Sequence, residues 1–425
     1  MTLPEPLERA WSTLIAHPWW RRVVTSQTYK DLREFTSLPP WQGYELTLRR
    51  LLNLYLVRWQ IGRGSTWLRG NPVKLTVEAT NICNLQCPAC FTGSGQEGRA
   101  RSHMSLELYR RLLDELGPTL FELEFYNWGE PLLARHIYAM IGDAHRSGIS
   151  TTVSTNFSIP FDAEKAERLV QSGLTVLGVS IDGARQETYE QYRVKGDLSL
   201  VLHNCRLVRD AKRRLNSKWP RMIWEFHVFP HNTEDIDTAR QLAAELDMEL
   251  AVDKGWVIGP EWDTEGRYRY ALEARAGRCP FLWAIAVVNN DGGVAPCCGT
   301  FYREDDRGRL ALKAGDGGAA TFREVWNGER FTTARRFFRR RDGSPAERED
   351  VCFGCPVTVN WERFEVHKRA GGTKATFRPD HTNHDAANYF WSRRPSRPGG
   401  RVPAAVPLPV ASVEASVEDG ERAAP

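Results

Sequence analysis

The sequence lacks the features of a membrane-spanning, secreted or nucleic-acid-binding protein. No apolar stretch in its 425 residues approaches the ~20 residues of a membrane-spanning helix, and the longest, residues 281–288, has the length of a strand. Residues 1–5 show no basic segment ahead of an apolar core, so no secretory signal is expected. The 57 basic and 53 acidic side chains nearly balance, whereas a nucleic-acid-binding protein concentrates positive charge. We therefore expect a cytoplasmic protein with no transmembrane segment and no nucleic-acid partner.

Cysteine is scarce over most of the chain, which has nine in all. Three lie within residues 83–90 and five within residues 279–355. In a reducing cytoplasm, cysteines clustered in this way bind metal more often than they form disulfides. The ninth, Cys205, lies among Leu and Val residues of a predicted helix, so we expect it to be a core residue.

Residues 1–70 predict a helical N-terminal extension rich in tryptophan and arginine. Its apolar side chains recur at roughly helical spacing: Leu46, Leu48, Leu51, Leu52, Leu54, Tyr55 and Trp59. One apolar face indicates a helical cap packed on the main domain. Peripheral contact with a membrane surface is the alternative, because interfacial anchors lie side by side at Trp19, Trp20, Arg21 and Arg22.

Residues 71–275 alternate between β-rich runs and amphipathic helical segments, which predicts a parallel α/β domain. The predicted strands are residues 73–79, 122–126, 151–155, 176–181, 223–229 and, more weakly, 248–252. Gly148 and Gly173 stand just past two helical segments, where a helix end favours a residue that tolerates the left-handed conformation. Six units predict a partial (β/α)6 barrel, with its chemistry at the carboxyl ends of the strands.

The loop after the first predicted strand holds Cys83, Cys87 and Cys90. Three thiolates can bind three irons of a [4Fe–4S] cubane and leave the fourth iron open to a substrate or cofactor. A structural zinc site needs four ligands, and no fourth cysteine is nearby. A zinc or redox motif with a distal ligand is the alternative for these three cysteines alone.

The spacing Cys-x3-Cys-x2-Cys after a first strand resembles the radical S-adenosylmethionine (radical SAM) superfamily. The resemblance implies that S-adenosylmethionine chelates the open iron and that one electron releases a 5′-deoxyadenosyl radical from it. Many members have an aromatic residue just before the third cysteine, whereas this chain has Ala89 there and Phe91 after it. That departure leaves open which ring covers the adenine.

The resemblance extends to polar motifs that follow the next three predicted strands. It implies that S-adenosylmethionine is contacted by Gly129, Glu130, Ser154, Asn156, Ser180, Asp182 and Arg193. The Gly-Glu pair would lie beside the methionine amino group, and Arg193 could pair with the carboxylate. Each motif alone is an ordinary turn or cap. Their order at successive strand ends favours the functional interpretation.

Residues 276–370 predict a small cysteine-rich module that depends on metal. Cys279, Cys297, Cys352 and Cys355 supply four thiolates, enough for one closed [4Fe–4S] cluster or for a zinc ion. Cys298 could replace its neighbour Cys297. The layout resembles the Twitch module, the short form of SPASM, which implies one auxiliary cluster. Residues 371–425 form a tail that we expect to be disordered from about residue 393.

A closed auxiliary cluster would accept or relay an electron, so we predict a radical SAM oxidoreductase that carries out a net oxidation of a small molecule. Two other classes stay open: a radical SAM maturase that modifies a peptide or protein, and a non-enzymatic zinc or iron–sulfur regulatory protein. The resemblance also implies a one-electron reductant such as flavodoxin or ferredoxin.

Overall fold

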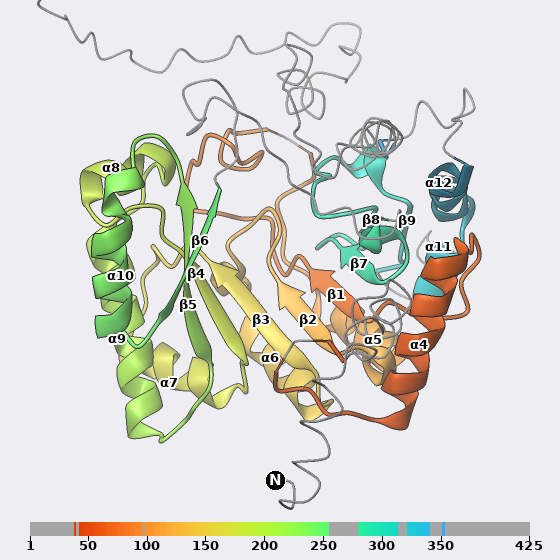
Figure 1. Ribbon diagram of the computed structural model, residues 1–425, viewed down its shortest axis with the longest axis horizontal. Coiled ribbons are helices and arrows are strands. Elements are labelled where there is room, and N and C mark those ends of the chain that lie inside the picture. The colour runs from red at the N-terminus through yellow and green to blue at the C-terminus, as the bar shows by residue number, and fades with distance from the viewer. Residues whose placement is uncertain are drawn as a thin grey trace, which may run out of the picture.

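The computed structural model describes residues 38–39, 42–96, 98–254, 279–312, 321–340 and 351–352. The predictions for residues 1–37, for Cys355 and for the tail from 371 lie outside these residues. One sheet runs through the molecule in the order β6-β5-β4-β3-β2-β1-β7-β8-β9 (Figure 1). Its strands are β1 Lys74–Val77, β2 Glu122–Phe125, β3 Ser150–Thr155, β4 Val176–Ser180, β5 Arg221–Val228, β6 Glu249–Lys254, β7 Ile285–Val288, β8 Gly293–Ala295 and β9 Gly308–Arg309.

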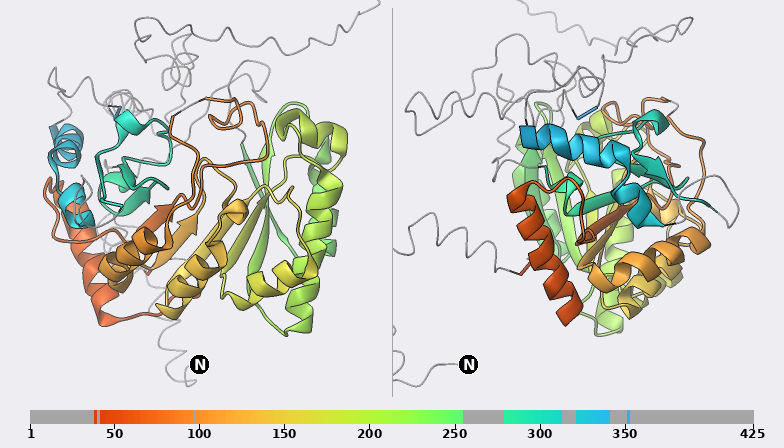
Figure 2. Two further views of the ribbon diagram at one scale, coloured as in Figure 1. Left: turned by 180° about the vertical axis from the view of Figure 1, so that it is seen from behind. Right: turned by 90° about the vertical axis from the view of Figure 1, so that its right-hand side faces the viewer.

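Helices lie along the outer side of this sheet and at its two ends (Figures 1 and 2). They are α4 Leu48–Arg63, α5 Leu106–Leu116, α6 Ile137–Arg146, α7 Ala163–Gln171, α8 Gln186–Tyr192, α9 Leu198–Arg214, α10 Ile236–Glu245, α11 Phe322–Trp326 and α12 Glu329–Arg340. None of the helices in the described ranges is both long and apolar enough to span a bilayer.

The predicted α/β fold with a partial barrel of six parallel strands is confirmed. Strands β1 to β6 each pair in parallel with the next, including the weakly predicted β6. The sheet does not close, since β6 and β9 stand at opposite ends of the strand order in the described part of the chain. Gly148 and Gly173 follow α6 and α7 with φ of 65° and 83°, the left-handed conformation expected at those helix ends.

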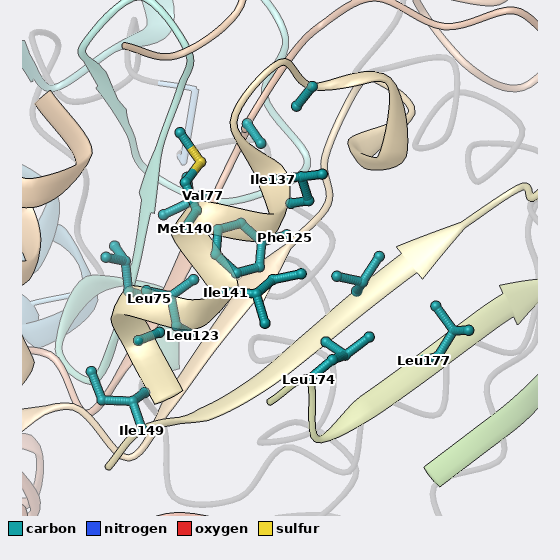
Figure 3. Packing of buried hydrophobic residues seen from close by; sticks show 14 of the residues in the cluster. Leu75, Val77, Leu123, Phe125, Ile137, Met140, Ile141, Ile149, Leu174 and Leu177 are labelled. Atoms are coloured by element: carbon teal, nitrogen blue, oxygen red, sulfur yellow. The ribbon is translucent and has the colours of Figure 1, made fainter. Parts of the chain in front are cut away.

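The core lies between the sheet and its outer helices. Leu75 and Val77 of β1 and Leu123 and Phe125 of β2 alternate toward this side and are fully buried. They pack with α6 residues such as Met140 in a single cluster (Figure 3). Because apolar side chains take one face of each strand, the opposite face is left for polar side chains inside the partial barrel.

The C-terminal module continues the same sheet. Strand β7 pairs in parallel with β1, and Val77 lies opposite Val288. The predicted hairpin is present, because Asp291 and Gly292 turn β7 back into the antiparallel strand β8. The apolar run 281–288 is not a single strand: its first residues belong to the 3-10 turn Pro280–Leu282, which Pro280 initiates. Strand β1 is therefore hydrogen-bonded on both sides.

The predicted apolar face of α4 is only in part the side that packs on the domain. Leu48 and Leu52 are 72% and 60% exposed, and Leu46 and Trp59 are also exposed. Leu54 of the predicted face is buried, and the rest of the buried side consists of Arg50, Asn53, Val57 and Gln60. Polar side chains face the domain here because backbone groups at the ends of other elements need partners.

The Arg50 guanidinium supplies most of those partners. It donates to the carbonyl oxygens of Ser147 at 2.6 Å, Gly148 at 2.8 Å and Gly117 at 3.4 Å, and to that of Glu45. The carbonyls of Gly117, Ser147 and Gly148 lie at the ends of α5 and α6, where a helix leaves acceptors unpaired, and that of Glu45 precedes α4. Burial lowers the pKa of Arg50 below its usual value. Helix α4 is thus held to the domain by a buried cation capping two helix ends.

We predict that Arg50→Met destabilises the protein by about 2–4 kcal/mol, because several buried carbonyls lose their donor. Arg49→Met at the exposed neighbouring position serves as the matched control and should change stability by less than about 0.5 kcal/mol. Urea unfolding of the two variants measures the difference. Equal stability of the two variants would contradict this role of Arg50.

Candidate active site

The three cysteines of the loop after β1 share one apolar lining. Cys87 is buried with Leu85, Tyr192 and Phe229, and the partly buried Cys83 and Cys90 pack against the same cluster. Tyr192 ends α8 and Phe229 follows β5, so the far side of the partial barrel reaches over the loop. The rings of Tyr192 and Phe229 lie 4.4 Å apart. This lining keeps water away from the thiols.

Burial makes the three thiols hard to ionise. It raises the pKa of Cys83 to about 12 and of Cys87 to about 11, and it also raises the pKa of Cys90. Two groups oppose this effect: the backbone N–H of Leu85 hydrogen-bonds Cys83, and the Arg193 guanidinium lies beside Cys87 and hydrogen-bonds it. The Asn156 amide lies 3.6 Å from the Cys83 sulfur. In the described residues no three His, Cys, Asp or Glu side chains form a ready-made metal site. The thiols share a loop without converging on one point.

Arg193 is held in place by a buried carboxylate. Asp182 is fully buried and accepts from Arg193 Nε at 2.6 Å and from the backbone N–H of His227 at 2.7 Å. Burial alone would raise the pKa of Asp182, but Arg193 and His227 outweigh it and hold the pKa below its usual range. The predicted residues Asp182 and Arg193 are thus brought together, with Arg193 placed between Asp182 and Cys87.

Glu130 is also buried and already has three donors. Its carboxylate accepts from the Thr155 hydroxyl at 2.6 Å and from the backbone N–H groups of Asn156 at 2.7 Å and Leu132 at 3.0 Å. A carboxylate has about four acceptor sites, so one stays available for an ammonium group. Burial raises the pKa of Glu130. The carboxylate ties the loop after β2 to the end of β3.

Gly129 is required by the close approach of two loops. A Cβ atom at this position would lie 2.0 Å from the carbonyl oxygen of Thr80, which follows β1. No side chain fits in that space. The glycine of the Gly-Glu pair therefore has a packing reason for its presence, independent of any ligand.

Ser154 and Ser180 both contact Glu225, a residue that the sequence analysis did not single out. Both hydroxyls donate to Glu225 Oε2, at 2.9 and 3.0 Å. Gly178 makes room for this carboxylate, because a Cβ there would lie 2.4 Å from Glu225 Oε1. Alternation along β5 is the signal that could have found it: Trp224 and Phe226 face the core, so Glu225 faces the inside of the partial barrel.

The inner face near β1 and β2 is charged. Lys74 lies 3.1 Å from Glu122 and also pairs with Glu124, and Thr76 donates to Glu124 at 3.2 Å. Next to them Tyr126 shares a hydrogen bond with the Cys298 thiol, and burial raises the pKa of both groups. The inner face of the partial barrel therefore carries carboxylates, a cation and a thiol, whereas the opposite face of the sheet is apolar.

The two adjacent cysteines of the C-terminal module, Cys297 and Cys298, have different surroundings. Cys298 is engaged with Tyr126 on the inner face, whereas the Cys297 carbonyl accepts from the Thr300 hydroxyl at 3.0 Å in a turn. Cys279 and Cys352 pack against the main core, and Arg307 donates to the Cys352 sulfur at 3.0 Å. The fourth predicted ligand, Cys355, lies outside the described residues.

The sequence matches two family models, one over the partial barrel and one over the C-terminal module. Residues 77–240 match the radical SAM superfamily, and residues 279–356 match the SPASM iron–sulfur cluster-binding domain. The chain belongs to the radical SAM superfamily, with a C-terminal SPASM module. The radical SAM domain implies a [4Fe–4S] cluster and S-adenosylmethionine, and the SPASM domain implies auxiliary iron–sulfur binding.

Curated relatives are similar to parts of this chain. Fe-coproporphyrin III synthase of Methanosarcina barkeri is 31% identical over 130 residues, which is 30% of this chain and 32% of the relative. Mycofactocin maturase MftC of Mycolicibacterium smegmatis is 25% identical over 183 residues, 43% of this chain and 44% of the relative. The match thus spans less than half of either relative.

Solved structures with a similar arrangement include Streptococcus suis SuiB bound to S-adenosylmethionine. That structure has 12% sequence identity and a TM-score of 0.49, and it covers 67% of this chain and 72% of its own. BtrN in complex with AdoMet and 2-DOIA has 18% identity and a TM-score of 0.40, and it covers 63% of this chain and 87% of its own.

The residues around the three thiols fit the cluster that the radical SAM domain implies. Cluster binding needs thiolates, and the apolar lining alone would oppose their charge. The Asn156 amide and the Arg193 guanidinium supply hydrogen bonds to two of the three sulfurs. Such donors tune iron–sulfur clusters. The donor set and the dry lining therefore suit an anionic iron–sulfur group.

Glu78 at the end of β1 is a buried carboxylate between the radical SAM domain and the module. It accepts from the backbone N–H groups of Trp128 at 3.3 Å and Asn290 at 3.4 Å. Burial raises its pKa to about 7, an effect that nearby Arg99 opposes in part. Between pH 4.5 and about 7, unfolding therefore releases a proton.

We predict that Glu78 makes stability fall as the pH rises. Its contribution is fully present below the ordinary carboxyl pKa of 4.5 and is lost by about pH 7, a change of about 3 kcal/mol. Glu78→Gln should therefore gain stability relative to the wild type between pH 5 and pH 8, as measured by urea unfolding.

The matched control for this experiment is Glu107→Gln, which changes an exposed carboxylate in the first turn of α5. Its stability difference from the wild type should stay constant over the same pH range. A constant difference for Glu78→Gln as well would show that Glu78 is ionised throughout.

Proposed function

We propose that this protein is a radical SAM oxidoreductase that reductively cleaves S-adenosylmethionine and uses the resulting 5′-deoxyadenosyl radical to remove a hydrogen atom from its substrate. The observation that carries the proposal is the loop with Cys83, Cys87 and Cys90, packed in a dry lining under hydrogen-bond donors. When bound, the cluster supplies the electron for the cleavage. The protein supplies orientation and exclusion of water.

The residues proposed to contact S-adenosylmethionine surround this loop in two groups. Glu130 with Gly129 and Asn156 forms the first, and one free acceptor site of Glu130 suits the methionine ammonium. Ser154, Ser180, Asp182 and Arg193 form the second group on β3, β4 and the segment after α8. Arg193 is fixed by Asp182, which supports its use as a pre-oriented donor to the methionine carboxylate.

We further propose that Cys279, Cys297, Cys352 and Cys355 hold one auxiliary [4Fe–4S] cluster, which takes up an electron and makes the reaction a net oxidation. Cys297 is the proposed ligand of the adjacent pair because the Cys298 thiol is engaged with Tyr126 on the inner face. Arg307 beside Cys352 supplies positive charge and a hydrogen bond to a thiolate.

A small polar molecule is the proposed substrate, because the inner face of the partial barrel presents Lys74, Glu124 and Glu225. A peptide- or protein-modifying maturase is the second candidate, and the match to mycofactocin maturase MftC favours it. Flavodoxin or ferredoxin is the proposed electron donor. The cytoplasm is the proposed compartment, because cysteines clustered as in residues 83–90 and 279–355 bind metal more often than they form disulfides in a reducing environment.

We predict that anaerobically reconstituted, reduced protein forms 5′-deoxyadenosine from S-adenosylmethionine. Cys87→Ala should lower this rate by at least about 100-fold, because even an outer-shell partner of a metal site can be worth that much. Chromatographic assay of 5′-deoxyadenosine measures the effect. Cys205→Ala is the control, because Cys205 is a buried thiol of α9 remote from the loop in sequence. Equal activity of Cys87→Ala and the parent would refute the mechanism.

Iron analysis tests the assignment of the adjacent cysteines. The reconstituted wild type should hold about eight irons per chain, and Cys297→Ala about four. Cys298→Ala should keep about eight. The reverse result would exchange the roles of the two cysteines, and zinc without sulfide in the wild type would indicate a regulatory metal site.

A further inference from the structure

Four aromatic rings connect the three-cysteine loop to the module. Phe91, directly after Cys90, stacks on Phe301 with ring centres 5.0 Å apart and planes 6° from parallel. It also meets Trp128 edge-on at 4.9 Å and Tyr302 at 5.6 Å. Trp128 comes from the loop after β2, next to Gly129. We call Phe91, Trp128, Phe301 and Tyr302 the four-ring cluster.

The four-ring cluster is closely fitted on the module side. Phe91 and Phe301 are each 5% exposed, and a Cβ on Gly98 would lie 2.4 Å from the Phe301 ring. The Trp128 indole N–H donates to the carbonyl of Thr300 at 2.9 Å. Thr300 in turn donates its hydroxyl to the carbonyl of Cys297 at 3.0 Å. Contacts thus lead without a break from the residue after Cys90 to Cys297.

Charged side chains reinforce the same contact. Arg99, whose side chain is 1% exposed, lies 3.1 Å from Asp291 and 2.5 Å from Asp306 of the module. Asn290 donates to Asn81 at 3.1 Å and to the Ser102 hydroxyl at 2.7 Å. Ion pairs this deeply buried fix geometry more than they add stability. These contacts hold the segment after the three-cysteine loop against the β7–β8 hairpin of the module.

The three-cysteine loop has little regular structure of its own. The described residues between 81 and 104 contain no helix and no strand apart from one isolated bridge, between Thr80 and His103. A segment without regular backbone pairing opens easily unless side chains hold it. Leu85 and Cys87 anchor it on the barrel side by packing with Tyr192 and Phe229. On the module side its order depends on the contacts of the four-ring cluster and of Arg99.

We propose that the four-ring cluster is a positioning element through which the folded C-terminal module holds the Cys83–Cys90 loop in order. The inference rests on the proposed function, because it concerns the loop that would carry the catalytic cluster. In a chain whose module is not folded, Phe91 loses its stacking partner and the loop opens. The catalytic site is then completed only on a chain that has also formed its auxiliary module.

The test compares backbone amide hydrogen exchange in residues 84–96 of the full chain, both without iron and after anaerobic reconstitution. Phe301→Leu removes the ring stacked on Phe91 and should speed exchange there by roughly tenfold, since aromatic pairs add to the energy of plain burial. Phe301→Tyr keeps the ring and should restore the wild-type rate. Chelator-driven iron loss from the reconstituted Phe301→Leu protein should speed up by a similar factor.

Phe331→Leu is the matched control, because Phe331 is buried in the module and packs on Trp326 at 4.7 Å. It should leave exchange in residues 84–96 unchanged. Equal acceleration by Phe331→Leu and Phe301→Leu, or no acceleration by either, would overturn the proposal.

A second pair of variants covers the case in which Phe301→Leu does not fold. Trp128→Phe keeps a ring in the four-ring cluster and should protect the loop better than Trp128→Leu, and equal exchange in the two would also overturn the proposal. Failure of the wild type to form 5′-deoxyadenosine would refute the proposed chemistry but would leave these exchange rates as they are.

Discussion

The site depends first on backbone hydrogen bonding between adjacent parallel strands. Because β1, β2, β3 and β4 pair in sequence order and all in parallel, their carboxyl ends reach the same edge of the sheet. Loops separated by up to a hundred residues therefore meet. A single antiparallel strand among the four would carry its polar residues to the opposite edge, away from the three cysteines.

Buried polar groups then convert this shared edge into a defined arrangement. Glu130 joins the loop after β2 to the end of β3, Asp182 orients Arg193, and Glu225 collects the hydroxyls of Ser154 and Ser180. Each carboxylate is paired by donors from another element, as buried charge requires. The thiols gain hydrogen bonds from the same network, so positioning and electrostatics come from the same residues.

Local patterns predicted the six strands and the position of the polar motifs after them, because alternation and turn residues are local properties of the sequence. Contacts between residues far apart in the sequence were not predicted. The periodicity of α4 gave an apolar stripe but could not show that Arg50 would pack inward, since its acceptors lie up to 98 residues away. Glu225 was overlooked within a recognised strand. The sequence pattern leaves open which ring covers the adenine, and the structure stacks Phe91 on Phe301.

The pairing of β7 with β1 has a consequence for how such proteins can be recombined. Cutting the chain ahead of residue 279 would leave the edge of β1 bare, with unpaired amides and carbonyls directly before the three-cysteine loop. The C-terminal module therefore cannot be replaced by that of a relative through a simple fusion at a linker. An exchange that preserves the fold would have to carry β7 in its register and the ring that meets Phe91.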